Sequence, residues 1–549
     1  MAGLAPGSAV DHRGTTFTQP LLASLLLAVC DLATGHPRFG IADFCSATFQ
    51  AGADFGSATF QGRPNFRRAT FQAGVDFGLA TFQEGVNFDS ATFQGLASFM
   101  SASFLGSADF GSASYQSDAW FMSASFQGPA WFMSASFLGS ANFDSAAFSG
   151  PAWFMSAIFR GDAWFGSATF QTDARFESAV FEQEVSLGPL VCAGRLKLSG
   201  AVFGGPATLL IAAHRLECRR TRWSSTASLQ LRYATVDFDH AVFEYPLTIA
   251  AQAAAFTLLD GRAIDEQMLA HAPDAGVRIA TLRGVDAAHL VLADVDLAGC
   301  LLLGTVHLDQ LRLEGACTFD TTPTAVQWRG RRPVRFTPRR TLAEEQHWRA
   351  SRPGAAPGWN TAVLGAWRAG PLQLAPVYRA LRKAFEDGKH EPGAADFYYG
   401  EMEMRRHADD IPRSERGLLT AYWALSGYGL RASRALCWLA ATMLVTIVLL
   451  MGFGLPQDTP KQQATGTVPA GGGKVTFEIG KDDPLNPAGD RFTGKRFEKA
   501  LSVTLNSVVF RSSGQDLTTT GTYIEMTSRL VEPALLALAV LAVRGRIKR

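Results

Sequence analysis

The sequence has few features that would support a disulfide framework, a metal centre or a strongly charged binding face. Its 549 residues include seven Cys, which are scattered, odd in number and without a CxxC pair. This pattern excludes a disulfide scaffold and a Cys-based zinc site, and it fits a reducing compartment. Lys plus Arg (50) nearly balances Asp plus Glu (49), so no global basic field attracts nucleic acid. We therefore expect no nucleic-acid partner.

The common catalytic motifs are also missing. The chain holds no GxSxG, HExxH or Walker loop, and no GxGxxG on a strand–turn–helix. Its ten His show no ligand spacing. The sequence therefore predicts no enzymatic activity, and it offers no catalytic residue, cofactor-binding residue or metal ligand.

What the sequence has in excess is Phe, with 40 residues against 9 Tyr and 11 Trp. From Phe44 to Phe181, Phe recurs at gaps that alternate between five and six residues, and Tyr115 takes one of the positions. Ala stands two residues before nearly every Phe, as in ADFGSATFQG at 53–62. Neither a helical period of 3.6 nor a strand period of 2 explains this spacing.

A squared coil explains the spacing, because each group of five or six residues then makes one side. Four sides make a coil of 22 residues, and neighbouring coils pair their backbones at about 4.8 Å. Phe and Ala point inward, where large and small side chains fill a narrow interior. The extra residue of the longer gap is often Gly, which is suited to a corner.

This segment resembles the pentapeptide-repeat family, in its Phe-centred form AxFxxAxF. The resemblance implies a mainly β fold, a right-handed quadrilateral β-helix (solenoid), over residues 42–184. The alternating gap departs from the strict five-residue spacing of the family.

The regions on either side are less regular. Residues 185–322 alternate like irregular strands, which predicts a looser continuation of the solenoid or else a separate small β domain. Residues 1–41 are expected to cap the solenoid with an apolar helix in which Pro20 occupies the first turn. The alternative for this run, a signal peptide ending at Cys30, lacks a positively charged leader.

A small α-helical region follows. Residues 323–376 are rich in Pro, Gly and Arg and predict an exposed linker, and residues 377–434 predict a cytoplasmic helical hairpin.

Two apolar runs predict transmembrane helices at 435–454 and 524–543. Arg431 and Arg434 precede the first run, and the basic tail at 544–549 follows the second. The positive-inside rule then places both termini in the cytoplasm and the loop at 455–496 outside. The lipid bilayer of the cell membrane is thus an expected partner of this two-span chain.

The stretch at 497–512 is about half the length needed to cross a membrane, and two interpretations stay open. It is either an amphipathic helix on the membrane surface or a re-entrant pore helix. In the second case TTTGTYIEM (518–526) takes the place of a selectivity filter, with Thr519, Thr520 and Gly521 as the pore-like residues.

FYYGEMEMRRH (397–407) and SGYGLRASRAL (426–436) make the whole chain similar to membrane-anchored pentapeptide-repeat proteins of actinobacterial type. That family carries no assigned reaction, so the resemblance implies a membrane-anchored cytoplasmic scaffold for protein interaction. The alternative is a two-span, channel-like protein with a pore loop at 497–523 and the solenoid as its regulatory domain.

The residue before the first Phe of each unit is expected to face outward, and it is usually Asp or Asn. In four units it is Trp, and in three of these Met follows the Phe. We expect these side chains to form an apolar patch for a protein partner, a second copy or the membrane surface, although they also fit a ladder that only stabilises the wall. The predicted patch consists of Trp120, Trp131, Trp153, Trp164, Met122, Met133 and Met155.

Overall fold

The computed structural model describes most of the chain: residues 3–258, 261–324, 327–329, 332–334, 336–360, 369–457, 462–466, 471, 474–475, 477–481, 484–485, 489–509, 511–512 and 514–547. It divides into two compact units, residues 1–400 and residues 401–549. Each unit is described by itself below.

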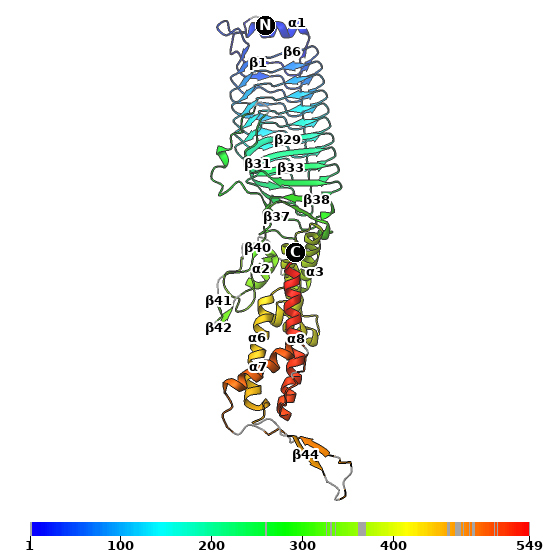
Figure 1. Ribbon diagram of the computed structural model, residues 1–549. Coiled ribbons are helices and arrows are strands. Elements are labelled where there is room, and N and C mark those ends of the chain that lie inside the picture. The colour runs from blue at the N-terminus through cyan, green and yellow to red at the C-terminus, as the bar shows by residue number, and fades with distance from the viewer. Residues whose placement is uncertain are drawn as a thin grey trace. The chain divides into compact units, whose positions relative to one another are not determined.

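The first unit contains a four-sided parallel β-solenoid, as the repeat predicted (Figure 1). The strands β4 (Ala42–Asp43), β5 (Thr48–Phe49), β6 (Ala53–Asp54) and β7 (Thr59–Phe60) form the sides of one coil. Each strand is short because a corner follows after five or six residues. Strands 22 residues apart pair in parallel, so β5 pairs with β8 (Thr70–Phe71) and Phe49 lies against Phe71.

The interior of the solenoid consists of stacked Phe rings alternating with Ala. Rings one coil apart are nearly parallel, as for Phe110 and Phe132, whose centroids lie 4.9 Å apart at 6°. Rings on different sides meet edge to face, as for Phe121 and Phe132 at 5.3 Å and 90°. All these Phe, and the Ala beside them, are buried. The predicted inward direction of both residue types is therefore confirmed.

The left-handed corner of each unit falls on a residue other than the expected Gly. Thirteen residues spaced eleven apart, from Ser46 to Ser178, have φ between 52° and 60°, and all but Arg68 and Leu79 are Ser. Some Gly of the longer gap have another function, as at Gly150, where a Cβ would lie 2.4 Å from the carbonyl oxygen of Gly128. That Gly lets two coils approach closely.

The solenoid begins before residue 42, in the region predicted to be only a cap. β1 (Val10–Asp11), β2 (Thr16–Phe17) and β3 (Arg38–Phe39) pair with β4, β5 and β7 of the following coils. Helix α1 (Gln19–Ala28), with Pro at its start, replaces part of this first coil and buries Leu22 and Leu25. An inward Phe, such as Phe17, extends the aromatic ladder into this coil.

Beyond β28 (Val180–Phe181) the sharp corners give way to long, bent strands. β29 (Val185–Lys197) runs along three sides and pairs with β31 (Ala207–Glu217), with two register shifts where it bends. Parallel pairing continues through β38 (Leu290–Ala293) to β39 (Arg312–Glu314). Residues 185–314 therefore continue the solenoid.

Part of the predicted exposed linker is buried, namely Arg339 and residues 341–346, whereas residues 351–358 are mostly exposed. The Glu344 carboxylate accepts the N–H groups of Leu302 and Leu303 at 2.6 and 2.8 Å, so the start of helix α2 (Ala343–Ala350) covers the backbone of the last coils. The Arg residues that suggested an exposed linker include Arg339, which is instead paired with the buried Glu345.

Two helices, α3 (Pro371–Asp387) and α4 (Glu391–His407), complete this end. Phe319 contacts Phe385 and Phe397. Lys383 of α3 bonds Asp309 at 2.7 Å.

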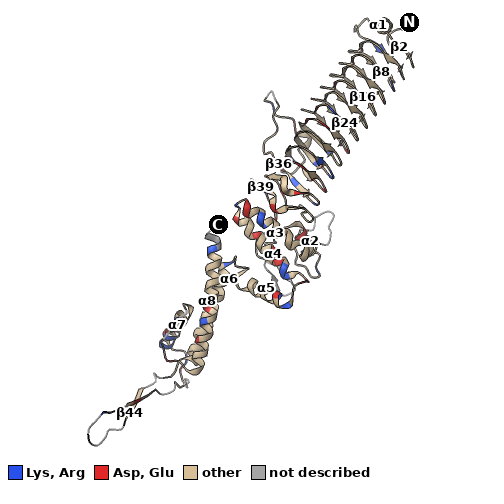
Figure 2. Ribbon diagram, turned by 90° about the vertical axis from the view of Figure 1, so that its right-hand side faces the viewer, with Lys and Arg blue, Asp and Glu red and all other residues tan. Residues whose placement is uncertain are grey.

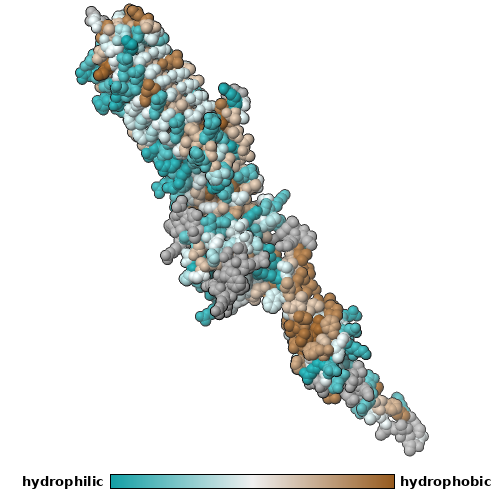
Figure 3. All heavy atoms as spheres, turned by 90° about the vertical axis from the view of Figure 1, so that its left-hand side faces the viewer, coloured by the Kyte–Doolittle hydropathy of each residue, from teal (hydrophilic) through white to brown (hydrophobic). Residues whose placement is uncertain are grey.

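The second unit is helical. It contains α5 (Arg413–Ser426), α6 (Ala432–Leu449) with a π-helical end (Leu450–Gly454), α7 (Gly494–Val508) and α8 (Thr519–Ile547), besides the hairpin of β44 (Gln462–Gly466) and β45 (Phe477–Lys481). Among the described residues, two helical stretches are long and apolar enough to cross a membrane, Ala432–Gly454 and Thr519–Arg544. Charged residues are sparse along them, and hydrophobic residues gather on their surface (Figures 2 and 3).

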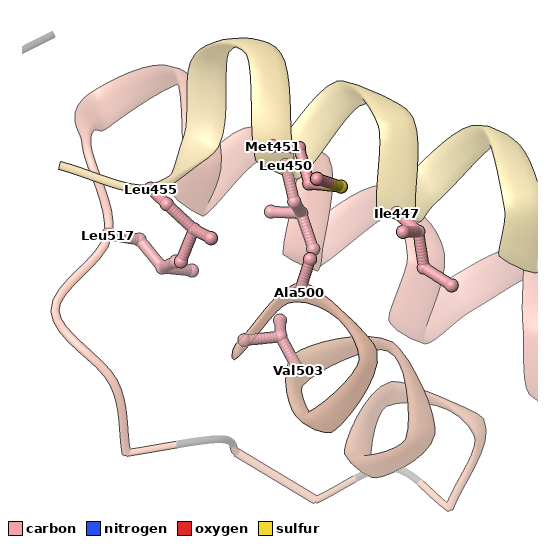
Figure 4. Close-up of a cluster of buried hydrophobic side chains, with 7 residues drawn as sticks. All are labelled: Ile447, Leu450, Met451, Leu455, Ala500, Val503 and Leu517. Carbon is pink, nitrogen blue, oxygen red and sulfur yellow. The ribbon is translucent and has the colours of Figure 1, made fainter. Parts of the chain in front are cut away.

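Helix α7 packs against α6 and α8. Its Ala500 and Val503 join a buried cluster with Ile447, Leu450 and Leu517 (Figure 4). Arg496 donates to the carbonyl oxygens of Met451, Leu455 and Pro456 at 2.8–3.0 Å, which satisfies the end of α6. The stretch predicted as a surface or re-entrant helix is thus held by an apolar core and by a cationic cap.

Candidate interaction surface of the solenoid

An Asp or Asn side chain caps most corners between the first and second Phe of a unit. In the Asn142 unit the side-chain oxygen accepts the N–H of Asp144 at 2.8 Å, and Asp109 accepts that of Gly111 at 3.0 Å. The same bond, over two residues, occurs at Asp43, Asp54, Asn65, Asp76 and Asn87. Short polar side chains are favoured here because they satisfy the backbone of a tight corner.

Four units place Trp where this cap would stand. The strands β17 (Ala119–Trp120), β19 (Ala130–Trp131), β23 (Ala152–Trp153) and β25 (Ala163–Trp164) each end in the Trp. An indole has no oxygen to accept the corner N–H, so the Trp cannot cap its own corner. In the Trp164 unit the N–H of Gly166 is instead accepted by the Asp144 carboxylate of the preceding coil at 2.6 Å. The substitution therefore removes a local stabilising bond and adds apolar surface.

Two of these Trp form a ladder on one side of the solenoid. Trp131 pairs with Trp153 in the neighbouring coil, and their rings stack at 5.6 Å and 21°. Both rings are partly exposed. Met133 and Met155 follow at equivalent positions, and Met133 is 37% exposed. Trp131, Trp153, Met133 and Met155 are called the Trp–Met patch below.

On the opposite side the two Trp are not adjacent. Trp120 pairs with Asn142, and Asn142 pairs with Trp164, so a polar side chain separates the two indoles. Met122, two residues after Trp120, is partly buried. The predicted Trp and Met residues therefore form two surfaces, of which only the Trp–Met patch is continuous over adjacent coils.

Charged residues border the Trp–Met patch at both ends. Asp109 pairs with Trp131 from the preceding coil, and Arg175 pairs with Trp153 from the following coil. Burial raises the pKa of Asp109, an effect opposed by the N–H that its carboxylate accepts from Gly111. Arg175 is bonded to Glu177 at 3.1 Å. The patch is thus an apolar area with Asp109 at one end and with Arg175, neutralised by Glu177, at the other.

The pore-like residues do not form an extended filter loop. Thr519, Thr520 and Gly521 form the first turn of α8, so their carbonyl groups point along the helix axis. A Cβ at Gly521 would lie 2.3 Å from the carbonyl oxygen of Gly454, which makes Gly521 a point of close helix contact. Their helical backbone differs from the loop that the filter interpretation requires, in which carbonyl oxygens line a pore.

The sequence alone showed the outward Asp and Asn but missed their function as corner caps. The signal was present, since each of these residues stands two positions before the amide it caps. The sequence also missed the hydrogen bond from Thr446 to Glu532, which joins α6 to α8 over 86 residues.

Inward Phe ladders, left-handed Ser corners and parallel coils of 22 residues together define a β-solenoid of quadrilateral coils. Residues 121–166 and 143–188 match the family model of pentapeptide repeats (9 copies). This stretch of the β-solenoid is therefore similar to pentapeptide repeats, in a Phe-rich form. No curated protein and no solved structure matches the chain significantly.

Proposed function

We propose that the protein is a membrane-anchored scaffold, with a solenoid that binds a protein partner or a second copy through the Trp–Met patch. No reaction is assigned to it. The observation that carries the proposal is the stacked pair Trp131 and Trp153, which replaces corner caps by partly exposed aromatic surface. Large, partly exposed indoles in a continuous apolar area are typical of protein interfaces.

A comparison of folding free energies supports a binding function for the Trp131–Trp153 pair. Each of the two corner hydrogen bonds contributes about 0.5–1.5 kcal/mol, and the single aromatic pair contributes about as much as one of them, in addition to the area that it buries. The exchange of caps for Trp is therefore close to neutral for folding. Stability alone gives no reason to keep two outward Trp in place of Asn.

The anchoring is inferred from the two apolar helical stretches and from the basic residues that flank them. Arg431 and Arg434 precede α6, and the tail at 544–549 is basic. These charges favour cytoplasmic termini and a cytoplasmic solenoid in a two-span arrangement. The close contact of Gly521 with Gly454 favours this reading over a channel with a pore loop.

The test replaces Trp131 and Trp153 together by Asn in the full chain, with a photo-crosslinking residue at Met155. We expect the double variant to keep its melting temperature within about 2 °C and to lose the crosslinked adduct or dimer formed by the parent chain. The matched control is Trp120→Asn with Trp164→Asn, on the opposite side, which should keep the adduct. An adduct that survives the first double substitution, or a large loss of stability with association intact, contradicts the proposal.

A further inference from the structure

Helix α8 holds a carboxylate near the middle of its apolar stretch. Glu532 is fully buried, and its Oε1 accepts the hydroxyl of Thr446 from α6 at 2.9 Å. Its Oε2 is buried and has no hydrogen-bond partner among the described residues. An ionisable group at this depth is costly, and it is retained where it has a function.

The neighbouring charges on α8 leave Glu532 as the excess negative group. Arg529 lies one turn away and donates to Glu525 at 2.6 Å. These two residues therefore form their own i,i+4 pair. Glu525 neutralises Arg529, which leaves Glu532 as the acidic side chain of this group without a basic partner among the described residues.

Glu532 lines a groove between α6 and α8. The groove has a volume of about 530 Å³, and its walls include Trp438, Val445, Leu449, Tyr523 and Ile524. Trp438 is 48% and Tyr523 is 68% exposed, so the groove opens on the apolar side surface of the two helices. A volume of this size suits a small organic ligand.

We propose that this groove binds a monovalent organic cation with apolar substituents, with Glu532 as its counter-ion. The occupant follows from charge complementarity, since Glu532, which has one unpartnered carboxylate oxygen, lines a mostly apolar space. The rings of Trp438 and Tyr523 provide π faces for a cation. A ligand with apolar substituents enters from the side on which these walls are exposed.

A bare metal ion fits the groove less well. Ca²⁺ needs six to eight oxygen ligands, and Mg²⁺ keeps a near-octahedral shell. Glu532 is the only carboxylate in the groove lining. The hydroxyls of Thr442 and Ser528 donate to backbone carbonyls at 2.9–3.0 Å. An organic cation, whose charge is spread over a large apolar surface, needs only one counter-charge.

The experiment measures binding of tetraphenylphosphonium to the full chain in nanodiscs of zwitterionic lipid. We expect saturable binding above that of empty nanodiscs, and a loss of affinity of about 30-fold for Glu532→Gln, since the counter-charge is removed. The matched control Glu498→Gln changes an exposed acid of α7 and should leave the affinity unchanged. Circular dichroism and elution volume establish that both variants fold.

A second variant keeps the test independent of Glu532. Trp438→Leu removes one aromatic wall and should weaken binding about tenfold. Absence of saturable binding, or equal affinity of the parent and Glu532→Gln, overturns the proposal. So does efficient disulfide formation between copies carrying Val445→Cys in a Cys437→Ser background, because a second chain would then fill the groove.

Discussion

The Phe coils and the helical end of the same unit, residues 337–400, are stabilised in opposite ways. In the coils, Phe132 has a ring above and a ring below, Phe154 at 4.8 Å and Phe110 at 4.9 Å, and the next coil repeats the arrangement. In the helical end, one buried carboxylate, Glu345, accepts bonds from Arg339, Arg349 and Tyr378. The first region divides its stability among equivalent apolar contacts, and the second concentrates it in one polar cluster.

This difference determines how damage spreads. A coil contacts only its neighbours, so a defect should stay local and the ladder on either side should persist. The Glu345 cluster joins α2 to α3 through Tyr378 and to the preceding segment through Arg339. Loss of its central charge should therefore loosen the whole end.

The largest expected effect is that of Phe132→Ala. The substitution leaves a void on the solenoid axis and should cost about 3–5 kcal/mol. Hydrogen exchange of the amides between 110 and 154 measures the loss in the full chain. The outward Gln94→Ala is the control and should cost within about 0.5 kcal/mol. Equal losses at the two positions would contradict the squared coil.

Glu345→Gln should cost about 3 kcal/mol, confined to residues 337–400. Burial alone would raise the pKa of Glu345, but the charges of Arg339 and Arg349 outweigh it and lower the pKa to about 2. The carboxylate therefore stabilises the fold above about pH 4.5, and this contribution is lost as the pH falls toward 2. Limited proteolysis between pH 4.5 and pH 2 should cleave residues 337–400 of the parent chain faster as the pH falls. The cleavage rate of the variant should not change with pH over this range. A parent chain insensitive to pH there would sink the explanation.

The smallest expected effect belongs to the corners. Ser145 has φ of 59°, a conformation that costs a non-Gly residue about 1 kcal/mol or more. Ser145→Gly should therefore stabilise its coil by about 0.5–1 kcal/mol, measured by local hydrogen exchange. Gly150→Ala is the opposite control, because its Cβ would meet the backbone of Gly128, and it should destabilise. A destabilised Ser145→Gly would mean that the Ser side chain stabilises the corner.

The repeat made most of the solenoid predictable. Inward Phe132 and the pairing of Trp131 with Trp153 follow from a count of residues, because each position recurs after 22 residues with the same surroundings. The corner residue was not predictable in this way, since Gly suits both a left-handed turn and a close backbone contact. The structure divides these functions between Ser145 and Gly150.

The polar contacts were beyond reach of the sequence for a different reason. Tyr378 and Glu345 are 33 residues apart, and Thr446 and Glu532 are 86 apart, with no repeat to bring them together. Within the predicted linker at 323–376, the burial of residues 341–346 was missed for the same reason. Pro- and Arg-rich composition is typical of exposed chain, and it does not reveal that Arg339 has a buried partner.

The 22-residue register gives the solenoid a fixed axial rise for each coil. Side chains joined across adjacent coils, such as Asn65 and Asp43, are 22 residues apart, and each coil advances the chain by about 4.8 Å. Insertion or removal of one whole coil therefore keeps every side chain on its own side. It changes only the distance from the N-terminal helix α1 to the Trp–Met patch, in steps of one coil. The length of the solenoid can thus change without a change in the side on which each surface residue lies.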